Sequence, residues 1–171
     1  MSVPARNRET VARLYEVHGR SLLAYACTFA PDLAAAEDVV HGVFLRLLSG
    51  KVTLPDSPLP YLFKAVRNTA LNERRRQTRE VALSHAAGWL EAPAGLEDDA
   101  IALETALGTL PLEQREVVVL RIWGQLSFEE VGVVIGCSIN TAASRFRYGC
   151  QKLRAVLRPL TKETADGRPA G

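Results

Sequence analysis

The chain has 171 residues, of which 47% are hydrophobic, so it is long enough for one ordinary globular domain or two small ones and too apolar for a disordered tail. Its formal net charge of +2 is low for a protein that binds a polyanion, unless the charges are sorted along the chain. It has no run of roughly 18 apolar residues and no apolar signal segment, so we expect a cytoplasmic protein without membrane insertion.

An all-α fold is predicted, because alternating apolar and polar runs bounded by hairpin turns are nearly absent. The first helix is expected over residues 9–29, where an apolar stripe recurs at helical spacing until Pro31 ends it. The second is expected from Leu33, behind Asp32 as a candidate N-cap, to about Gly50.

Three prolines within residues 51–60 predict a loop, because proline fixes φ and lacks the amide hydrogen that a continuous helix needs. A third helix is expected to start at Pro60 and to run through apolar positions into the arginines at residues 74–76. Together these three helices predict an N-terminal domain over residues 1–80.

Residues 81–100 are expected to form an acidic linker, because they contain glycine, proline and acidic residues without a sustained helical period. A second small helical domain is expected over residues 101–160, with Pro111 in the first turn of one helix. Its helices are predicted over residues 100–107, 111–123, 127–135 and 138–157. After Pro159 the chain becomes polar and is expected to fray, and residues 161–171 are expected to form a disordered tail.

The basic residues are concentrated in two blocks. Residues 64–79 contain six cations and one acid, Glu73, and residues 139–158 contain five cations and no acid. For the first block, the alternative interpretation is that the helix macrodipole favours cations at the C-terminal end of the helix. This effect explains one or two cations rather than three consecutive arginines. The chain is therefore expected to have two basic faces despite its low net charge. Such faces are typical of a nucleic-acid-binding protein.

No catalytic site is predicted. Cys27, Cys137 and Cys150 fit neither a disulfide framework nor a zinc-ligand spacing with the histidines, and they are interpreted as small buried hydrophobes. The sequence shows no clustered carboxylates and no nucleophile beside a base, so an enzyme that acts on nucleic acid lacks support. We expect no enzymatic activity, no metal and no cofactor.

The local signals around residue 130 predict a helix-turn-helix. Ser127 and Glu130 form an S-x-x-E capping box, which fixes the start of one helix. Gly136 stands where a helix ends in a left-handed residue, and Ser138 can cap the next helix two residues later. A helix, a three-residue turn and a second helix result, which is the spacing of this motif.

The second helix of the motif is expected to present a small, polar and basic face. Its inward residues are predicted to be Ile139, Ala142, Phe146, Cys150, Leu153 and Val156. Its outward residues are predicted to be Asn140, Thr141, Ser144, Arg145, Arg147 and Tyr148. Such side chains can approach base edges and phosphates in a major groove. A solvated helix face is the alternative, but the two caps, the turn glycine and the acid-free basic face coincide here.

The residues of this motif carry a resemblance to a known family. The C-terminal half resembles extracytoplasmic-function (ECF) sigma factors, small members of the sigma-70 family, in the segment LPLEQREVVVLRIWGQLSFEEVGVVIGCSINTAASRFR (residues 110–147). The N-terminal half resembles the family's polymerase-docking segment in AEDVVHGVFLRLL (residues 36–48) and its promoter-melting helix in PYLFKAVRNTALNERRR (residues 60–76). Together the matches cover most of residues 10–158, in the family's order.

The resemblance implies a transcription initiation factor that binds core RNA polymerase, directs it to promoter DNA and helps to open the duplex. It also implies an anti-sigma factor as a regulatory partner. In the family the C-terminal helix reads the duplex minus-thirty-five element. That role falls on Asn140, Thr141, Ser144, Arg145 and Arg147, and Ala143, where lysine is usual, can instead touch a thymine methyl group.

The resemblance assigns two further sets of residues to the N-terminal half. The loop over residues 51–60 captures a base flipped from the minus-ten element, and the strand is held by Lys64, Arg67, Asn68, Arg74, Arg75 and Arg76. The polymerase-docking set is Asp38, Val40, His41, Phe44, Leu45 and Leu48. For the apolar members Val40, Phe44 and Leu48, simple packing against the first and third helices is an equal alternative.

Gly42 departs from the family pattern, because an acidic residue is usual at this position of the docking helix. A glycine inside a helix costs ~1 kcal/mol relative to alanine. This departure motivates an alternative function: a DNA-binding regulator of the same ancestry that acts without core polymerase.

Overall fold

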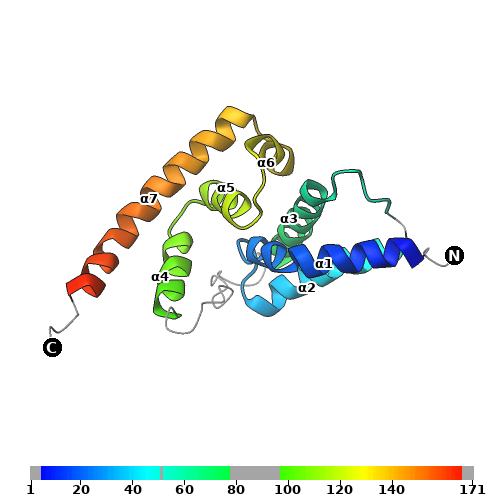
Figure 1. The fold of residues 1–171 in the computed structure, drawn as a ribbon, viewed down its shortest axis with the longest axis horizontal. Helices are drawn as coiled ribbons and strands as arrows, with labels where there is room; N and C mark the ends of the chain where they lie inside the picture. The colour runs from blue at the N-terminus through cyan, green and yellow to red at the C-terminus, as the bar shows by residue number, and fades with distance from the viewer. Residues whose placement is uncertain (1–4, 51, 78–96, 167–171) are drawn as a thin grey trace.

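The computed structural model describes residues 5–50, 52–77 and 97–166, and in these residues it contains seven α-helices and no strand (Figure 1). The helices are α1 (Ala5–Ala26), α2 (Leu33–Leu48), α3 (Pro58–Gln77), α4 (Glu97–Gly108), α5 (Leu112–Ile122), α6 (Phe128–Ile135) and α7 (Ile139–Asp166). The prediction of an all-α fold is confirmed. Within the described ranges, no helix combines the length and the apolar character that crossing a membrane requires.

Helices α1, α2 and α3 pack around a core of aromatic and aliphatic side chains. The Tyr25 ring makes edge contacts with Phe29 and Phe63, at centroid distances of 5.3 and 5.5 Å. Asp32 caps α2 as predicted, because its Oδ1 accepts a hydrogen bond of 2.8 Å from the amide of Ala35. Helix α3 begins at Pro58, slightly before the predicted start at Pro60, since prolines in a first turn lack only amide hydrogens that have no partner within the helix.

The C-terminal helices form a second group, in which α7 packs against α4, α5 and α6. A small core of Ala106, Leu107, Leu110, Val118 and Leu153 joins α4 to α5 and α7. The guanidinium of Arg115 donates to the carbonyls of Gly108 and Leu110, at 2.7 and 3.1 Å. It thereby satisfies carbonyls at the end of α4 that have no partner inside the helix.

The two groups share one continuous core. The largest cluster of buried side chains includes residues of α1, α2 and α3 together with Val117, Leu120, Leu126, Val131 and Val134 from the second group. Helix α3 packs against α6, and α1 packs against α5. In Figure 1, α5 and α6 accordingly lie between α7 and the first three helices.

The structure differs from the sequence prediction at three places in the second group. Helix α4 begins at Glu97, inside the predicted linker, whose residues 81–96 lie outside the described ranges. Pro111 is the N-cap of α5 rather than part of its first turn. The predicted end of the last helix near residue 157 is wrong, because α7 continues past Pro159 to Asp166. The amide hydrogen that Pro159 lacks would bond the carbonyl of Ala155, a residue exposed to water that can replace it.

Candidate DNA-binding and docking surfaces

The helix-turn-helix is built from α6 and α7 as the sequence predicts. The Oγ of Ser127 accepts a hydrogen bond of 3.1 Å from the amide of Glu130, and Glu130 Oε2 accepts one of 2.7 Å from the amide of Ser127. Gly136 ends α6 in the left-handed region, with φ of 76°. The Oγ of Ser138 then accepts from the amide of Thr141 at 3.1 Å. Both caps and the turn glycine are therefore confirmed.

The turn between α6 and α7 also depends on Gly132, which the sequence analysis did not single out. The carbonyl of Gly132 accepts hydrogen bonds from the amides of Gly136 and Cys137, at 2.8 and 3.0 Å. A Cβ at position 132 would lie 2.6 Å from the carbonyl oxygen of Cys137. The turn thus packs directly against α6 and leaves no room for a side chain at position 132.

Helix α7 turns one face to the core and the opposite face to solvent. Ala142, Gly149 and Leu153 are buried, and a Cβ at Gly149 would lie 2.8 Å from Cγ2 of Val118 on α5. Two predicted inward residues are wrong, because Ile139 and Val156 are 48% and 38% exposed. Ile139 is the first residue of α7, and Val156 lies in the C-terminal half of the helix.

The predicted reading residues divide into exposed and half-buried members. Asn140 and Arg147 are exposed, while Thr141, Ala143, Ser144 and Arg145 are half-buried. The Arg147 guanidinium lies 5.3 Å from the centroid of the Tyr148 ring, which is also exposed. Arg145 points toward α5, where its Nη2 pairs with Glu113 Oε2 at 3.1 Å. The face that is most open to a duplex is therefore the one that carries Asn140 and Arg147.

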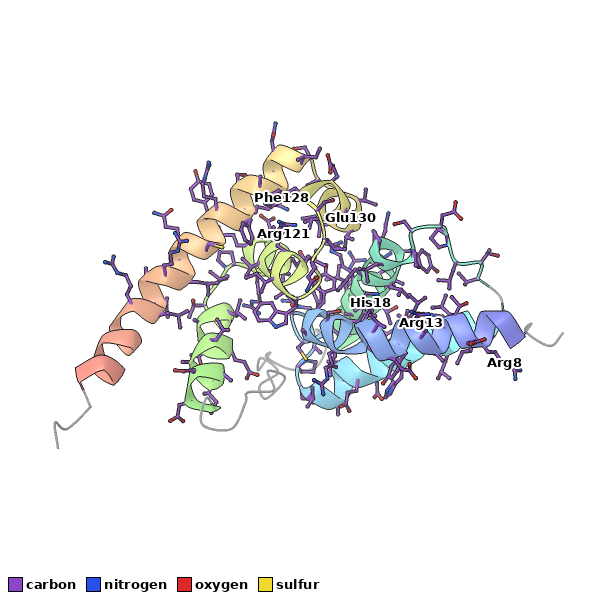
Figure 2. All side chains as sticks on the ribbon, in the orientation of Figure 1. Arg8, Arg13, His18, Arg121, Phe128 and Glu130 are labelled. Carbon is purple, nitrogen blue, oxygen red and sulfur yellow. The ribbon has the colours of Figure 1, made fainter. Side chains whose placement is uncertain are left out.

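Arg121 connects the three helices that hold the motif, and the sequence analysis missed it. Its guanidinium lies 4.5 Å from the ring centroid of Phe128 on α6 and 6.0 Å from that of Phe146 on α7. It also donates a hydrogen bond to the carbonyl of Leu126. Figure 2 shows Arg121 and Phe128 where α5, α6 and α7 meet, close to Glu130 of the capping box. The contacts fix α7 relative to α5 and α6.

The predicted minus-ten residues are spread along α3. Lys64, Asn68, Arg75 and Arg76 are exposed, and Arg74 is half-buried. Arg67 instead turns into the interface between the two helical groups, where its Nε donates to Glu116 Oε1 at 2.6 Å. Residues 52–57 of the predicted capture loop precede α3, and residue 51 lies outside the described ranges.

Glu116 of α5 is buried and accepts hydrogen bonds from two residues of α1–α3. Besides the pair with Arg67, its Oε1 accepts a hydrogen bond of 3.0 Å from the hydroxyl of Tyr25 on α1. Burial and the charge of Glu116 raise the pKa of Tyr25 well above its ordinary value. Burial alone would lower the pKa of Arg67, but the hydrogen bond and charge of Glu116 raise it overall. Both partners therefore remain in the protonation states that bind the carboxylate.

The predicted polymerase-docking set on α2 contains both exposed and buried residues. Asp38 and His41 are exposed, and Leu45 and Leu48 are 65% and 38% exposed. Val40 and Phe44 are only 3% and 5% exposed and belong to the core, so packing is the better interpretation for these two. The surface that a partner can touch is therefore formed by Asp38, His41, Leu45 and Leu48.

An apolar groove of about 480 Å³ lies between α1 and α2 beside this surface. Leu45 and Leu48 line one side of it, and Val11 and Tyr15 line the other. The Tyr15 hydroxyl on α1 and His41 Nε2 on α2 form a hydrogen bond of 3.0 Å, and the Tyr15 ring makes an edge contact with Phe44. An exposed apolar groove of this kind is typical of a site that binds another protein.

Two family profiles match the chain: Sigma-70 region 2 over residues 14–80, and Sigma-70 region 4 over residues 100–153. The ECF RNA polymerase sigma factor EcfG of Rhodopseudomonas palustris is 32% identical over 145 residues, which are 80% of this chain and 79% of that protein. The chain belongs to the ECF sigma factors of the sigma-70 family. In this sigma factor α2 and α3 fall within region 2, and α5 and α6 fall within region 4.

Solved structures of sigma factors share this fold. The sigma factor RpoE of Bartonella quintana, solved with the anti-sigma factor NepR, matches with a TM-score of 0.75 at 23% identity, over 88% of this chain and 98% of that one. CnrH, solved with the cytosolic domain of CnrY, matches with a TM-score of 0.64 at 26% identity, over 90% of each chain. The shared fold thus extends over about nine-tenths of this chain and is not limited to its helix-turn-helix.

Gly42 does not disturb the fold of this sigma factor. A Cβ at this position would meet no atom within 4 Å. The glycine lies beside a second groove of about 380 Å³ between α2 and α3, which Asp38 and Arg46 also line. The alternative of a regulator without polymerase rested on this residue, and the family relationship does not favour it.

Proposed function

We propose that this sigma factor binds core RNA polymerase in the cytoplasm and directs promoter-specific transcription initiation, without an enzymatic activity of its own. The observation that carries the proposal is the separation of two kinds of surface on one chain. An apolar groove with exposed leucines lies between α1 and α2, and an exposed polar and basic face lies on the capped recognition helix α7. The first suits a protein partner, and the second suits duplex DNA.

The test of this function is transcription in a purified system. The full chain is added to core polymerase with a promoter mapped from its transcripts in the native cell, and run-off product is measured. We expect initiation at that promoter only when the sigma factor is present. If the protein binds this DNA tightly alone but never starts transcription with core polymerase, the proposal is wrong and the regulator alternative holds.

We propose that α7 reads the minus-thirty-five element through Asn140, Thr141, Ala143, Ser144, Arg145 and Arg147. Arg147 has the most open approach to a duplex, whereas the pair with Glu113 restricts the orientation of Arg145. An arginine held by a carboxylate loses less side-chain freedom when it meets a guanine edge or a phosphate. Glu113 is therefore proposed to orient Arg145.

Replacing Arg147 with alanine should weaken binding of the holoenzyme to its promoter by ~1–3 kcal/mol, because this is the range for loss of an arginine that contacts a base. Fluorescence anisotropy with labelled duplex DNA measures the effect. Arg154→Ala is the matched control, since Arg154 is an exposed arginine two turns further along α7. Equal losses in the two variants would mean that Arg147 contributes only general positive charge.

We propose that α3 and the preceding loop hold the minus-ten element. Extruding a base costs a few kcal/mol, so a strand that has been opened needs cations close by. Lys64, Asn68 and Arg75 are exposed along α3 and can meet phosphates directly. The loop before α3, over residues 52–57, is proposed to receive the flipped base.

The exposed part of α2 is the proposed polymerase contact, with Leu45 at its centre. Replacing Leu45 with alanine should weaken binding to core polymerase about tenfold, because burying an exposed leucine side chain at an interface contributes ~1.5–3 kcal/mol and alanine loses most of it. Val133→Ala is the control, since Val133 is 60% exposed but lies on α6. Binding of labelled sigma factor to core polymerase measures both. An unchanged affinity for Leu45→Ala would place the contact elsewhere.

We also propose that an anti-sigma factor binds this chain. RpoE of Bartonella quintana, whose fold this chain shares, was solved in complex with the anti-sigma factor NepR. The apolar groove between α1 and α2 offers such a partner a site beside the proposed polymerase contact. A partner seated there would compete with core polymerase for Leu45 and Leu48.

A further inference from the structure

The start of helix α7 carries an exposed apolar residue. Ile139 is the first residue of this helix and is 48% exposed, although its helical spacing predicted an inward position. The cap at Ser138 fixes the helix start, because its Oγ accepts a hydrogen bond from the amide of Thr141. Ala142, one turn later, is fully buried. The core therefore begins at Ala142, and Ile139 lies outside it.

Ile139 stands at the end of a row that leads to the proposed duplex contacts. Residues four positions apart lie one above the other on a helix, so Ile139, Ala143 and Arg147 form one row along α7. Asn140, next to Ile139 in the sequence, is exposed as well. The segment from residue 139 to residue 158 contains five cations and no acid. The exposed isoleucine therefore belongs to a surface whose charge attracts DNA, which favours DNA as its partner.

The position of Ile139 within the helix suits contact with base edges. Side chains on a helix lean toward its N-terminus, so the Ile139 side chain extends toward the start of α7. The N-terminal residues of a recognition helix are those that meet base edges in the major groove. From Ile139 to Arg147 the helix advances about 12 Å, the length of roughly three to four base pairs. Ala143, between them, has a side chain too short to hold the helix away from the bases.

Thymine is the base that an exposed isoleucine can recognise. Its C5-methyl group is the apolar group that distinguishes thymine from the other bases in the major groove. Contact between that methyl and a branched aliphatic side chain removes apolar surface of both from water. We propose that Ile139 determines promoter specificity by reading one thymine of the duplex through its 5-methyl group. This inference rests on the proposed reading of the duplex by α7.

Replacing thymine with deoxyuridine tests the proposal on the DNA side. Deoxyuridine keeps the hydrogen-bonding groups of thymidine and lacks only the 5-methyl group. A duplex is first selected from a random library by its binding to the full chain together with core polymerase. Each thymine of this duplex is then replaced in turn, and fluorescence anisotropy measures the affinity of the complex for each labelled duplex.

We expect one thymine at which the replacement weakens binding about fourfold. This factor corresponds to ~0.8 kcal/mol, the value for one buried CH₂ group. In Ile139→Ala the affinity for the thymine duplex should fall. The same replacement should then change affinity less than about twofold, because the contact that it removes is already absent. Ile139→Val keeps a branched side chain and should retain most of the methyl effect.

Two variants on the same helix control for indirect effects. Val156→Ala removes another exposed branched side chain, in the C-terminal half of α7, and should leave both the affinity and the methyl effect unchanged. Arg147→Ala should weaken binding to both duplexes equally, so the methyl effect should remain. If the methyl effect is lost in Arg147→Ala as well, the assignment to Ile139 is overturned, because the whole helix has then shifted in the groove. Circular dichroism checks that each variant is folded.

The role of Ile139 is separable from the proposed function. Run-off transcription by the unsubstituted chain tests the function, whereas replacement by deoxyuridine tests Ile139. Transcription from a duplex in which no thymine is methyl-sensitive overturns the role of Ile139 alone, and so does a methyl effect that persists in Ile139→Ala. A methyl effect that Ile139→Ala abolishes supports the role even if no promoter is transcribed. A chain that selects no duplex overturns both the reading by α7 and the role of Ile139.

Discussion

Replacing Phe63 with alanine should lower the free energy of unfolding by about 3–5 kcal/mol, the range for removing a buried aromatic ring. Phe63 on α3 is fully buried, contacts the Tyr25 ring at 5.5 Å and lies against the turn that contains Gly124. Its ring thus packs against both helical groups, so the cavity left by alanine cannot close by moving one helix alone. Urea denaturation followed by circular dichroism measures the loss.

Asn72→Ala is the control for this prediction, because Asn72 is exposed on the same helix and its change should stay within about 0.5 kcal/mol. Phe63→Leu should fall between the two, since leucine fills part of the space. A loss below about 1 kcal/mol for Phe63→Ala would show that the ring is not packed in the shared core.

The features that the sequence predicted correctly are local. The capping box of Ser127 and Glu130, the left-handed Gly136 and the cap at Ser138 each involve residues within four positions of one another. Such signals depend on backbone groups at the helix ends, which are the same whatever packs nearby. The helix-turn-helix was therefore predictable in detail, down to the residue at which each helix begins.

The contacts between the helical groups were not predictable in the same way. Arg67 and Glu116 are 49 positions apart in the sequence, and the residues adjacent to either one do not predict its partner. A weaker signal existed, because Glu116 lies four residues after Leu112 and four before Leu120, on the apolar side of α5. An acid at such a buried position is expected to pair with a cation. The sequence contains many arginines, however, and does not identify the one that pairs with Glu116.

The orientation of α2 was undetermined for a related reason. Apolar residues surround most of this helix, so helical spacing alone defines no single buried stripe. Only the positions of α1 and α3 make Val40 and Phe44 core residues and leave Leu45 exposed. The sequence thus correctly predicted a helix for the residues of the proposed polymerase contact, but which of these residues are exposed could be known only from the tertiary structure.

Replacing Gly132 with alanine should lower the free energy of unfolding by about 1–3 kcal/mol, the usual cost of forcing an atom into a packed site. The new Cβ would lie 2.6 Å from the carbonyl oxygen of Cys137, which is backbone and cannot rotate away. Relief requires the turn to open, and this would also break the two hydrogen bonds that the Gly132 carbonyl accepts. Urea denaturation measures the loss of stability, and anisotropy with duplex DNA measures the loss of the recognition geometry.

Gly42→Ala is the matched comparison, because it makes the same chemical change inside a helix where the new Cβ meets nothing within 4 Å. There alanine should raise stability by up to ~1 kcal/mol through its higher helix propensity. Opposite signs for the two variants would show that packing against the turn, rather than glycine content, explains Gly132. A stabilising effect at both positions would mean that the turn adapts to a side chain at position 132.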